Sequence, residues 1–329
     1  MKKVVTLGGG TGSFTVLTGL KEFPYELTSI ISVTDSGGST GKLRDEFGYL
    51  PVGDFRMALV ALSESNGDNI LRQLFLYRFD KGSGLAGHNF GNLFLTALTE
   101  ILGSEKKAFE YASKILRVHG KVIPITNNNV TLVAEYENGE ILVGETFIDE
   151  PPKRHDGTSR IKKLKIQPKA NIFSKAKDEI LGADAVIIGP GDLYTSLIAN
   201  LVIEGVSSSL NKTKAKIIYI MNLMTKYGQT HNFSAKDHIN EIKKYIGRYP
   251  DYVLVNKNHL PKEILKKYKE ESAYPVVNDL KSVKEYKVIT RDFLAPEFVK
   301  KSSGDKLKRS LIRHDSKKLA KVIAQILSS

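Results

Sequence analysis

The sequence predicts an α/β protein whose main sheet is parallel and covered by helices on both faces. Three observations lead to this prediction. Short apolar runs alternate with helical patterns near both ends of the chain, as in βαβ units. Glycine-rich loops follow two of these runs, at residues 8–13 and 189–192. Between them, residues 121–166 alternate with period two around an Asn-Gly pair, which predicts a small antiparallel β insertion.

The individual elements follow in chain order. Residues 4–7 are expected to form the first strand, and the next helix should end before Pro24 because proline cannot continue a helix. No internal repeat or low-complexity linker divides the chain, so we predict one domain over residues 1–329. The remaining expectations are strands at 27–33, 130–136, 141–146, 161–166, 185–188, 217–220 and 252–255, a Gly/Ser loop at 36–41, and helices over 51–61, from 194 and over 316–327.

The composition excludes several classes of protein. Of the 329 residues, 41% are hydrophobic and 26% charged, which is enough apolar material for a core and excludes global disorder. The chain has no cysteine, which excludes disulfides, thiolate-ligated metals and thiol nucleophiles. No apolar run approaches the roughly 18 residues of a membrane helix, and the first run is too short for a signal peptide. We therefore expect no membrane span and a cytoplasmic location.

The net charge of +13 is unevenly distributed. Residues 151–329 carry a net charge of +17, whereas residues 1–150 carry −4. A basic half could attract nucleic acid or an anionic metabolite. The lysines recur at helical spacing, however, and no zinc-finger, helix-turn-helix or aromatic-interleaved basic motif accompanies them. We interpret the charge as a solvated surface and expect no specific nucleic-acid partner.

The two glycine-rich loops predict an anion site. Glycines after a strand allow a tight turn and a close approach to phosphate, whose charge the following helix N-terminus stabilises. Gly10 and Gly12 are expected to be required because a side chain there would clash with a diphosphate or be barred from a positive φ. In the second loop, the free amides and hydroxyls could hold a phosphate, or Asp192, Thr195 and Ser196 could simply cap the helix. Both loops should open into one crevice at the carboxyl ends of the strands.

Two known nucleotide motifs are approached but not matched. The first loop has Ser13 where a dinucleotide fingerprint has its third glycine, although Asp35 lies where such folds place a ribose-binding acid. An NAD-dependent oxidoreductase therefore stays open. Residues 36–43 imitate a P-loop, but the spacing is one residue short and Leu43 replaces the magnesium-binding Ser or Thr. A P-loop NTPase is not predicted.

Seven motifs occur in order along the chain, at residues 8–12, 35–44, 53–56, 87–93, 189–196, 221–225 and 313–315. Together they resemble the gluconeogenesis factor family, within the superfamily of 2-phospho-L-lactate transferases. This resemblance implies a Rossmann-like three-layer α/β/α fold with a nucleotide site at the two glycine loops. It implies a protein that binds UDP-N-acetylglucosamine and supports cell shape and wall synthesis during gluconeogenic growth, with no agreed reaction. The transferase branch implies the alternative, an enzyme that moves a phospho-acid group from a nucleoside diphosphate carrier to an acceptor hydroxyl.

The resemblance also assigns roles to residues. In a transferase, Asp54 would bind or deprotonate the acceptor and Arg56 would steady phosphate charge. No metal site is expected, and magnesium only for a transferase, because Ser36 stands where the family often has a second acid. The expected partners are a UDP-sugar or related nucleotide and, in a homo-oligomer, a second copy of the chain. The expected nucleotide contacts are Gly9, Gly10, Thr11, Gly12, Asp35, Gly189, Gly191, Thr195 and Asn222; the sugar or phosphate contacts are His88, Asn89, Tyr268 (or its neighbour Tyr274) and Arg313.

Overall fold

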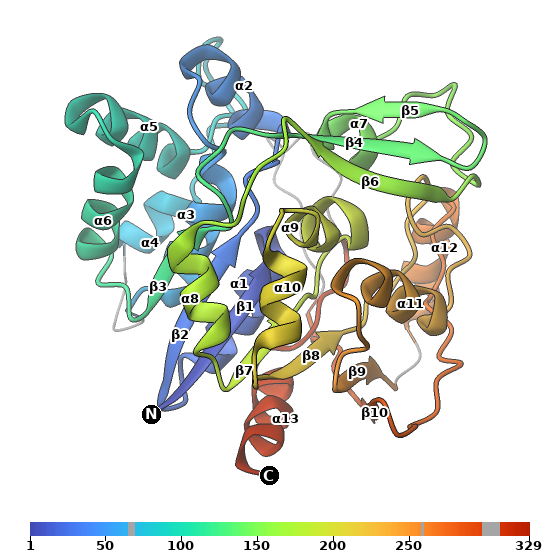
Figure 1. Cartoon of the computed structure of the whole chain (residues 1–329). Coiled ribbons are helices and arrows are strands. Elements are labelled where there is room, and N and C mark those ends of the chain that lie inside the picture. Colours follow the sequence, from blue (N-terminus) through green and yellow to red (C-terminus); the bar gives the residue numbers. More distant parts are fainter. Residues whose placement is uncertain (65–69, 258–259, 298–309) are drawn as a thin grey trace.

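Seven parallel strands form the central sheet of the computed structural model, which describes residues 1–64, 70–257, 260–297 and 310–329 (Figure 1). The strand order is β10-β9-β8-β7-β1-β2-β3, so the chain moves outward from β1 first in one direction and then in the other. Such a reversal opens a crevice at the carboxyl ends of the two central strands, here β1 and β7. The strands are β1 (Lys2–Gly8), β2 (Tyr25–Ile31), β3 (Lys121–Pro124), β7 (Ala185–Ile188), β8 (Lys216–Ile220), β9 (Tyr252–Asn256) and β10 (Lys287–Arg291).

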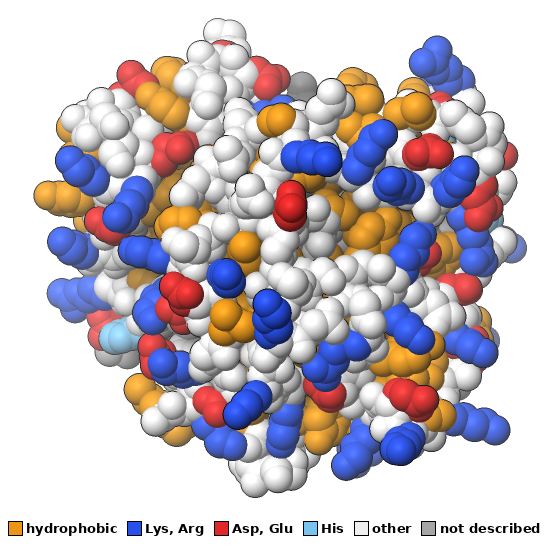
Figure 2. Space-filling view, in the orientation of Figure 1, with side chains coloured by type: hydrophobic (Ala, Val, Ile, Leu, Met, Phe, Trp, Pro, Cys, Tyr) orange, Lys and Arg blue, Asp and Glu red, His pale blue; other side chains and the backbone are white. Residues whose placement is uncertain are grey.

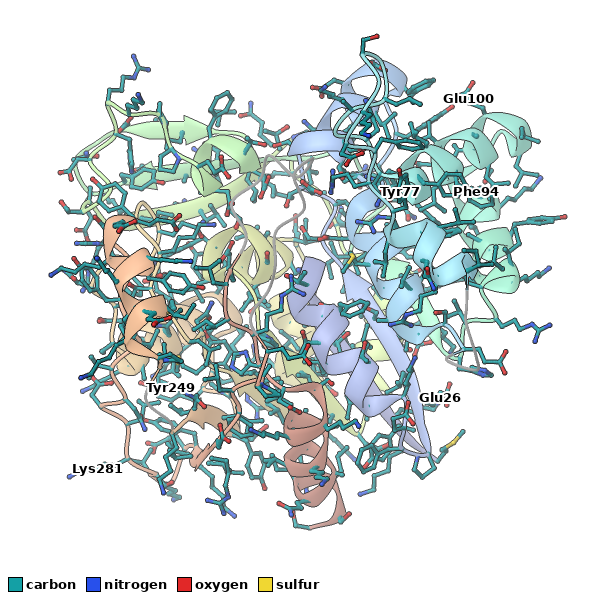
Figure 3. The ribbon with its side chains drawn as sticks, turned by 180° about the vertical axis from the view of Figure 1, so that it is seen from behind. Glu26, Tyr77, Phe94, Glu100, Tyr249 and Lys281 are labelled. Carbon is teal, nitrogen blue, oxygen red and sulfur yellow. The ribbon has the colours of Figure 1, made fainter. Side chains whose placement is uncertain are left out.

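Helices cover both faces of the sheet, which confirms the predicted three-layer α/β fold. Alternate residues of a strand face opposite sides, and in β1 Val4 packs into one apolar cluster while Val5 packs into the other. Figure 3 shows α1 and α13 side by side on the face opposite to that seen in Figure 1. One face carries α1 (Gly10–Leu20), α3 (Val52–Leu62) and α13 (Ser316–Ser328), and the other carries α8 (Ser174–Leu181), α10 (Val206–Lys212) and α11 (Ala235–Ile246).

A second group of helices lies beside the β3 edge of the sheet (Figure 1). It includes α2 over Gly38–Phe47, where the sequence predicts a Gly/Ser loop at 36–41. That expectation is wrong because the glycines here begin a helix: Gly37 is extended and serves as the N-cap, while Gly48, at φ 74°, ends α2. The other helices of the group are α4 (Ile70–Leu76), α5 (Phe90–Leu102) and α6 (Glu105–Ile115).

The predicted antiparallel insertion is a three-stranded sheet of order β5-β4-β6. Its strands are β4 (Thr131–Tyr136), β5 (Ile141–Val143) and β6 (Ile161–Gln167). The insertion begins later than the predicted residue 121, because residues 121–124 pair with β2 as the edge strand β3 of the main sheet. The strand expected to reach residue 146 ends at Val143, since Gly144 at φ 101° turns the chain into the short helix α7 (Glu145–Asp149).

Three further elements complete the described part of the chain. A π-helix, η1 (Leu193–Ile198), follows β7 and continues into α9 (Ala199–Leu201), and α12 (Lys262–Glu270) precedes β10. Within the described ranges, none of the helices combines the length and apolar character needed to cross a membrane.

Candidate functional site

A cavity of about 670 Å³ opens at the carboxyl ends of β1, β7 and β8. Both glycine-rich loops line it, together with α7, the loop after β8 and residues 310–314 near the C-terminus. The cavity therefore lies at the topological reversal of the sheet, where open α/β folds bind their ligands.

The first glycine loop places helix amides at the cavity. Gly10 begins α1 at φ +55°, which favours glycine, as predicted. Its N–H donates a 2.7 Å hydrogen bond to Oδ1 of Asp54, in the first turn of α3. At Gly12 the constraint is different: a β-carbon would lie 1.7 Å from the carbonyl oxygen of Pro190. The two glycine loops thus touch through Gly12.

A cation connects the second loop to the insertion. The ammonium group of Lys226, in the loop after β8, lies 2.5 Å from Oδ1 of Asp149 in α7 and 2.8 Å from Oδ2 of Asp192 at the start of η1. Asp149 Oδ1 also accepts hydrogen bonds from Thr195 at 3.1 Å and from Gln229 at 3.0 Å. Lys226 therefore offsets part of the negative charge that Asp149 and Asp192 bring to the second glycine loop.

The acids of the cavity have opposed pKa shifts. Burial would raise the pKa of Asp149, but Lys226 and the hydrogen bonds outweigh it and hold that pKa below its usual value. Burial raises the pKa of Asp192, and the Asp149 charge adds to the effect. Burial followed by the charges of Asp35 and Asp149 raises the pKa of Glu145 well above its usual range. Asp149 is therefore the most strongly ionised of these three acids.

Asp35 and Glu145 meet near the end of β2. The Gly37 N–H donates to Asp35 Oδ1 at 2.9 Å, and the Ser36 N–H donates to Glu145 Oε2 at 3.3 Å. Glu145 thus reaches the backbone of Ser36, the position where the family often has a second acid. In the described ranges, no three or more His, Asp or Glu side chains are placed to hold a metal ion.

The C-terminal wall of the cavity is built around Tyr268. Its ring is buried, and its hydroxyl accepts hydrogen bonds from the backbone N–H groups of Leu311 at 2.9 Å and Ile312 at 3.4 Å. Tyr268 thereby holds the backbone of residues 311–312 in place, and the next two residues, Arg313 and His314, line the cavity. Burial lowers the pKa of His314 to about 4, so this imidazole is neutral at pH 7.

The cavity brings together most of the residues singled out from the sequence. Gly189 lies next to the lining residue Pro190, and Tyr274 is not in the lining, whereas Tyr268 is. The lining members of the predicted set are Gly9, Gly10, Thr11, Gly12, Asp35, Asp54, Gly191, Thr195, Asn222, Tyr268 and Arg313.

Besides Gly189, three predicted residues lie outside the cavity lining. Arg56 is buried, and its Nε donates to the Asn92 side chain at 2.8 Å. Asn89 caps α5 by accepting from the Asn92 N–H at 3.2 Å. His88 Nδ1 lies 3.2 Å from the hydroxyl of Ser39 in α2. The Arg56 contact joins α3 to α5, and the His88 contact joins α2 to the residues just before α5. These side chains therefore hold helices together and do not line the cavity.

Sequence reasoning missed several lining residues. Glu145 and Asp149 are not predicted, because the sequence analysis expects a strand up to residue 146 instead of the helix α7. Their i, i+4 spacing fits one face of a helix. Lys226 directly follows the motif at 221–225, and Gln229 lies three residues further on. Only the folded chain shows that these groups surround the glycine loops.

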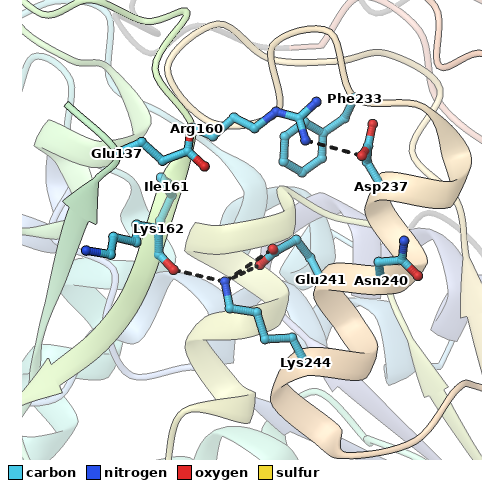
Figure 4. Close-up of a pocket in the computed structure, with 9 residues that line it drawn as sticks. All are labelled: Glu137, Arg160, Ile161, Lys162, Phe233, Asp237, Asn240, Glu241 and Lys244. Carbon is cyan, nitrogen blue, oxygen red and sulfur yellow. Dashed lines mark hydrogen bonds and ion pairs between the residues drawn. The ribbon is translucent and has the colours of Figure 1, made fainter.

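A second, smaller pocket lies between the insertion and α11 (Figure 4). Four of its charged groups already have partners: Arg160 contacts Asp237 at 3.2 Å, and Lys244 donates to the Lys162 carbonyl at 2.9 Å and contacts Glu241 at 3.2 Å. These contacts fasten β6 to α11, and the larger cavity is the candidate site.

Comparisons with known proteins show which family the chain resembles. The family model described as 2-phospho-L-lactate transferase CofD matches residues 4–294. The chain is similar to a gluconeogenesis factor of Bacillus subtilis, at 38% identity over 327 residues that cover 99% of this chain and 98% of the relative. It is similar to a gluconeogenesis factor of Halalkalibacterium halodurans, at 37% identity over 326 residues, or 98% and 96% of the two chains.

A solved structure extends the likeness to three dimensions. The crystal structure of a Bacillus halodurans protein matches with a TM-score of 0.87 and 36% identity, covering 98% of this chain and 99% of that one. The chain thus resembles these relatives in both sequence and fold over almost its whole length. The chain belongs to the gluconeogenesis factor family, within the 2-phospho-L-lactate transferase CofD family.

Proposed function

We propose that the cavity binds a nucleotide-activated sugar, UDP-N-acetylglucosamine, and that the protein is a cytoplasmic binding protein of the gluconeogenesis factor type, needed for cell shape and wall synthesis during gluconeogenic growth. The observation that carries the proposal is the meeting of two glycine loops at the topological reversal of the sheet, in a cavity of about 670 Å³. Ligand sites of small molecules typically have about 300–1,000 Å³. The volume therefore suits a nucleotide-sugar.

The phosphate end of the ligand would lie at the glycine loops. The Gly10 N–H already donates to Asp54, so the next residues at the start of α1, Thr11 and Gly12, would supply N–H groups and the positive end of the helix dipole. Arg313 lines the same cavity, and a guanidinium can donate two parallel hydrogen bonds to phosphate oxygens.

The base would lie against the C-terminal wall. Tyr268, Ala273 and Ile312 form a buried apolar cluster there, with Leu223 and Met224 packed against it, and all five line the cavity. Bases bind well on such apolar and aromatic surfaces. The Tyr268 hydroxyl is already occupied by backbone N–H groups, so its ring is the part available to a base.

Isothermal titration calorimetry tests the proposal. Wild-type protein should bind UDP-N-acetylglucosamine and bind NAD weakly. Arg313→Ala should weaken UDP-N-acetylglucosamine binding about ten- to hundredfold, because a charge-assisted hydrogen bond contributes about 1.5–3 kcal/mol. Arg291→Ala, an exposed change outside the cavity, is the control and should bind normally. Tighter binding of NAD would favour the oxidoreductase.

The transferase alternative rests on the family match and on Asp54 at the cavity. Asp54 remains a candidate to bind or deprotonate an acceptor hydroxyl, whereas Arg56 does not reach the lining. Magnesium in nucleotide sites commonly uses one or two carboxylates plus phosphate oxygens, and Asp35 is a lining carboxylate that could supply one of them. Turnover that releases a nucleoside monophosphate, abolished by Asp54→Asn, would establish the enzyme over the binding protein.

A further inference from the structure

We infer that the cavity wall formed by α7 and the loop after β8 is the subsite for the sugar of the nucleotide-sugar, and that the side-chain oxygen of Gln229 accepts a hydrogen bond from a sugar hydroxyl. This inference rests on the proposed function and adds an orientation and a specificity residue to it. We call this surface the polar wall; it consists of Glu145, Asp149, Glu150, Gln229 and Thr230.

The two sides of the cavity differ in chemistry. The side with Tyr268 is apolar and belongs to a buried cluster. The polar wall has three carboxyl groups and one amide within a short stretch of surface. Sugar hydroxyls are hydrogen-bond donors as well as acceptors, so they suit a wall rich in acceptors, whereas a flat base suits the apolar side.

Gln229 is a buried group that still needs a donor. The residue is 2% exposed and lines the cavity. Asp149 Oδ1 only accepts hydrogen bonds in its ionised form, so the amide atom 3.0 Å from it is Nε2, the donor. This assignment leaves Oε1 as an acceptor with no hydrogen-bond partner among the described residues. A buried acceptor of this kind is costly until a donor reaches it, and a ligand hydroxyl supplies one.

The polar wall adjoins the phosphate end of the cavity. Thr195, in η1 just after the second glycine loop, donates to Asp149 at 3.1 Å, the same oxygen that Gln229 contacts. A group attached to the outer phosphate at the glycine loops would therefore meet Gln229. A base on the apolar side and a sugar on the polar wall then lie on either side of the diphosphate.

The charge of the polar wall selects a neutral group. Lys226 is held between Asp149 and Asp192, and Lys153 is the other lysine of the lining. Against these two lysines stand Asp149, which is held ionised, and Glu150, while raised pKa values reduce the charge of Glu145 and Asp192. A further phosphate or carboxylate on the ligand would meet these acids, whereas an uncharged, hydroxyl-bearing sugar would not be repelled.

Calorimetry on the full chain tests the assignment with UDP and UDP-N-acetylglucosamine as separate probes. Gln229→Met keeps the size of the side chain and removes its polar atoms. It should weaken UDP-N-acetylglucosamine about tenfold, the effect of one hydrogen bond of about 1.4 kcal/mol, and leave UDP unchanged. Unchanged UDP binding also shows that the variant is folded. Gln325→Met, at an exposed position of α13, should change neither affinity.

Two outcomes of the variant experiment would overturn the inference. An equal loss for UDP and UDP-N-acetylglucosamine would show that Gln229 faces the nucleotide, and no loss for either would show that its oxygen meets no ligand group. A second measurement needs no variant: wild-type protein should bind UDP-glucose several-fold more tightly than UDP-glucuronate, which differs by one carboxylate. Equal or tighter binding of UDP-glucuronate would contradict the charge selection.

The failure of this inference can be told apart from the failure of the proposed function. If wild-type protein binds neither UDP nor UDP-N-acetylglucosamine, both are overturned. If it binds the two equally and Arg313→Ala weakens both, the nucleotide site stands and the sugar subsite alone is overturned.

Discussion

At the scale of single residues, close contacts decide what the glycine loops can tolerate. The sequence justifies Gly10 and Gly12 by the same argument, yet the structure gives them different reasons. Gly10 requires glycine for its φ of +55°, whereas Gly12 requires it because the Pro190 carbonyl leaves no space for a β-carbon. The nearby positions therefore respond differently to substitution.

We predict that Gly12→Ala separates the two glycine loops. A β-carbon at 1.7 Å from the Pro190 oxygen forces a backbone shift, and overpacking of this kind costs about 1–3 kcal/mol. Nucleotide affinity should fall about tenfold or more, since both loops form the phosphate end. Titration calorimetry and urea unfolding measure the two effects. The control is Gly84→Ala, where a β-carbon meets no atom within 4 Å. Normal binding by Gly12→Ala would remove the first loop from the site.

At the scale of elements, one lysine joins three segments that are distant in the sequence. Lys226 in the loop after β8 holds Asp149 of α7 and Asp192 before η1. The insertion is thereby attached to the second glycine loop by charge as well as by packing. The three side chains are between about a quarter and two-fifths exposed, so solvent in the cavity screens the network partially.

We predict that Lys226→Met destabilises the fold and that Asp192→Ser partly restores it. Removal of the lysine leaves the carboxylates of Asp149 and Asp192 facing each other. Loss of one partner from a fully buried ion pair lowers the free energy of unfolding by about 3–5 kcal/mol, and solvent screening should reduce this loss to about 1–2 kcal/mol here. In the double variant the carboxylate of Asp192 is also absent, so Asp149 no longer faces a second negative charge and part of the stability returns. Urea unfolding of the wild type, both single variants and the double variant gives the coupling energy. Additive effects of the two substitutions would show that the network contributes no coupling.

At the scale of the whole molecule, the excess positive charge is spread out. Figure 2 shows lysines and arginines dispersed over one face, with acidic side chains between them. Part of the charge also serves internal pairs, such as Lys121 with Glu26 and Glu179. This arrangement agrees with a solvated surface.

We predict weak binding to random double-stranded DNA at about 0.15 M salt, with a steep loss as salt rises, because non-specific contacts depend on counterion release. Fluorescence anisotropy over a salt series measures this. Tight, sequence-selective binding at physiological salt would instead establish a nucleic-acid partner.

The stability of the whole molecule should depend on His238 in α11. This residue is buried, and burial lowers its pKa from 6.5 to about 4. Between these two pH values the unfolded chain binds more protons than the folded protein. The contribution of neutral His238 to the free energy of unfolding is therefore fully present above pH 6.5 and is lost as the pH falls towards 4. At pH 5 the loss is about 2 kcal/mol. His238→Leu should therefore show a flatter fall of the urea midpoint from pH 7 to 5 than the wild type, with the exposed His119→Leu as control. Equal slopes in wild type and His238→Leu would contradict this.

The sequence by itself determined the elements whose signals are local. The βαβ rhythm, the Asn-Gly hairpin and the glycines after β1 and β7 depend on neighbouring residues, so most strands, the first helix and the α/β class follow from them, whereas β3 and β10 at the two sheet edges do not. Local signals also misled: the glycines at 37–41 read as a loop, whereas packing against Ser36 and the α5 region makes Gly38–Phe47 a helix.

Only the tertiary structure decided which side chains share the cavity. Asp54, Arg56 and His88 carry equally plausible motif signals, but the helix directions send Asp54 to Gly10 and Arg56 to Asn92. No local pattern shows that Gln229 and Asp149 meet, because the contact between them spans 80 residues of the chain. The physical reason is that helix and strand formation depends on near neighbours, whereas a site is made by hydrogen bonds and charges between segments that only the complete fold brings together.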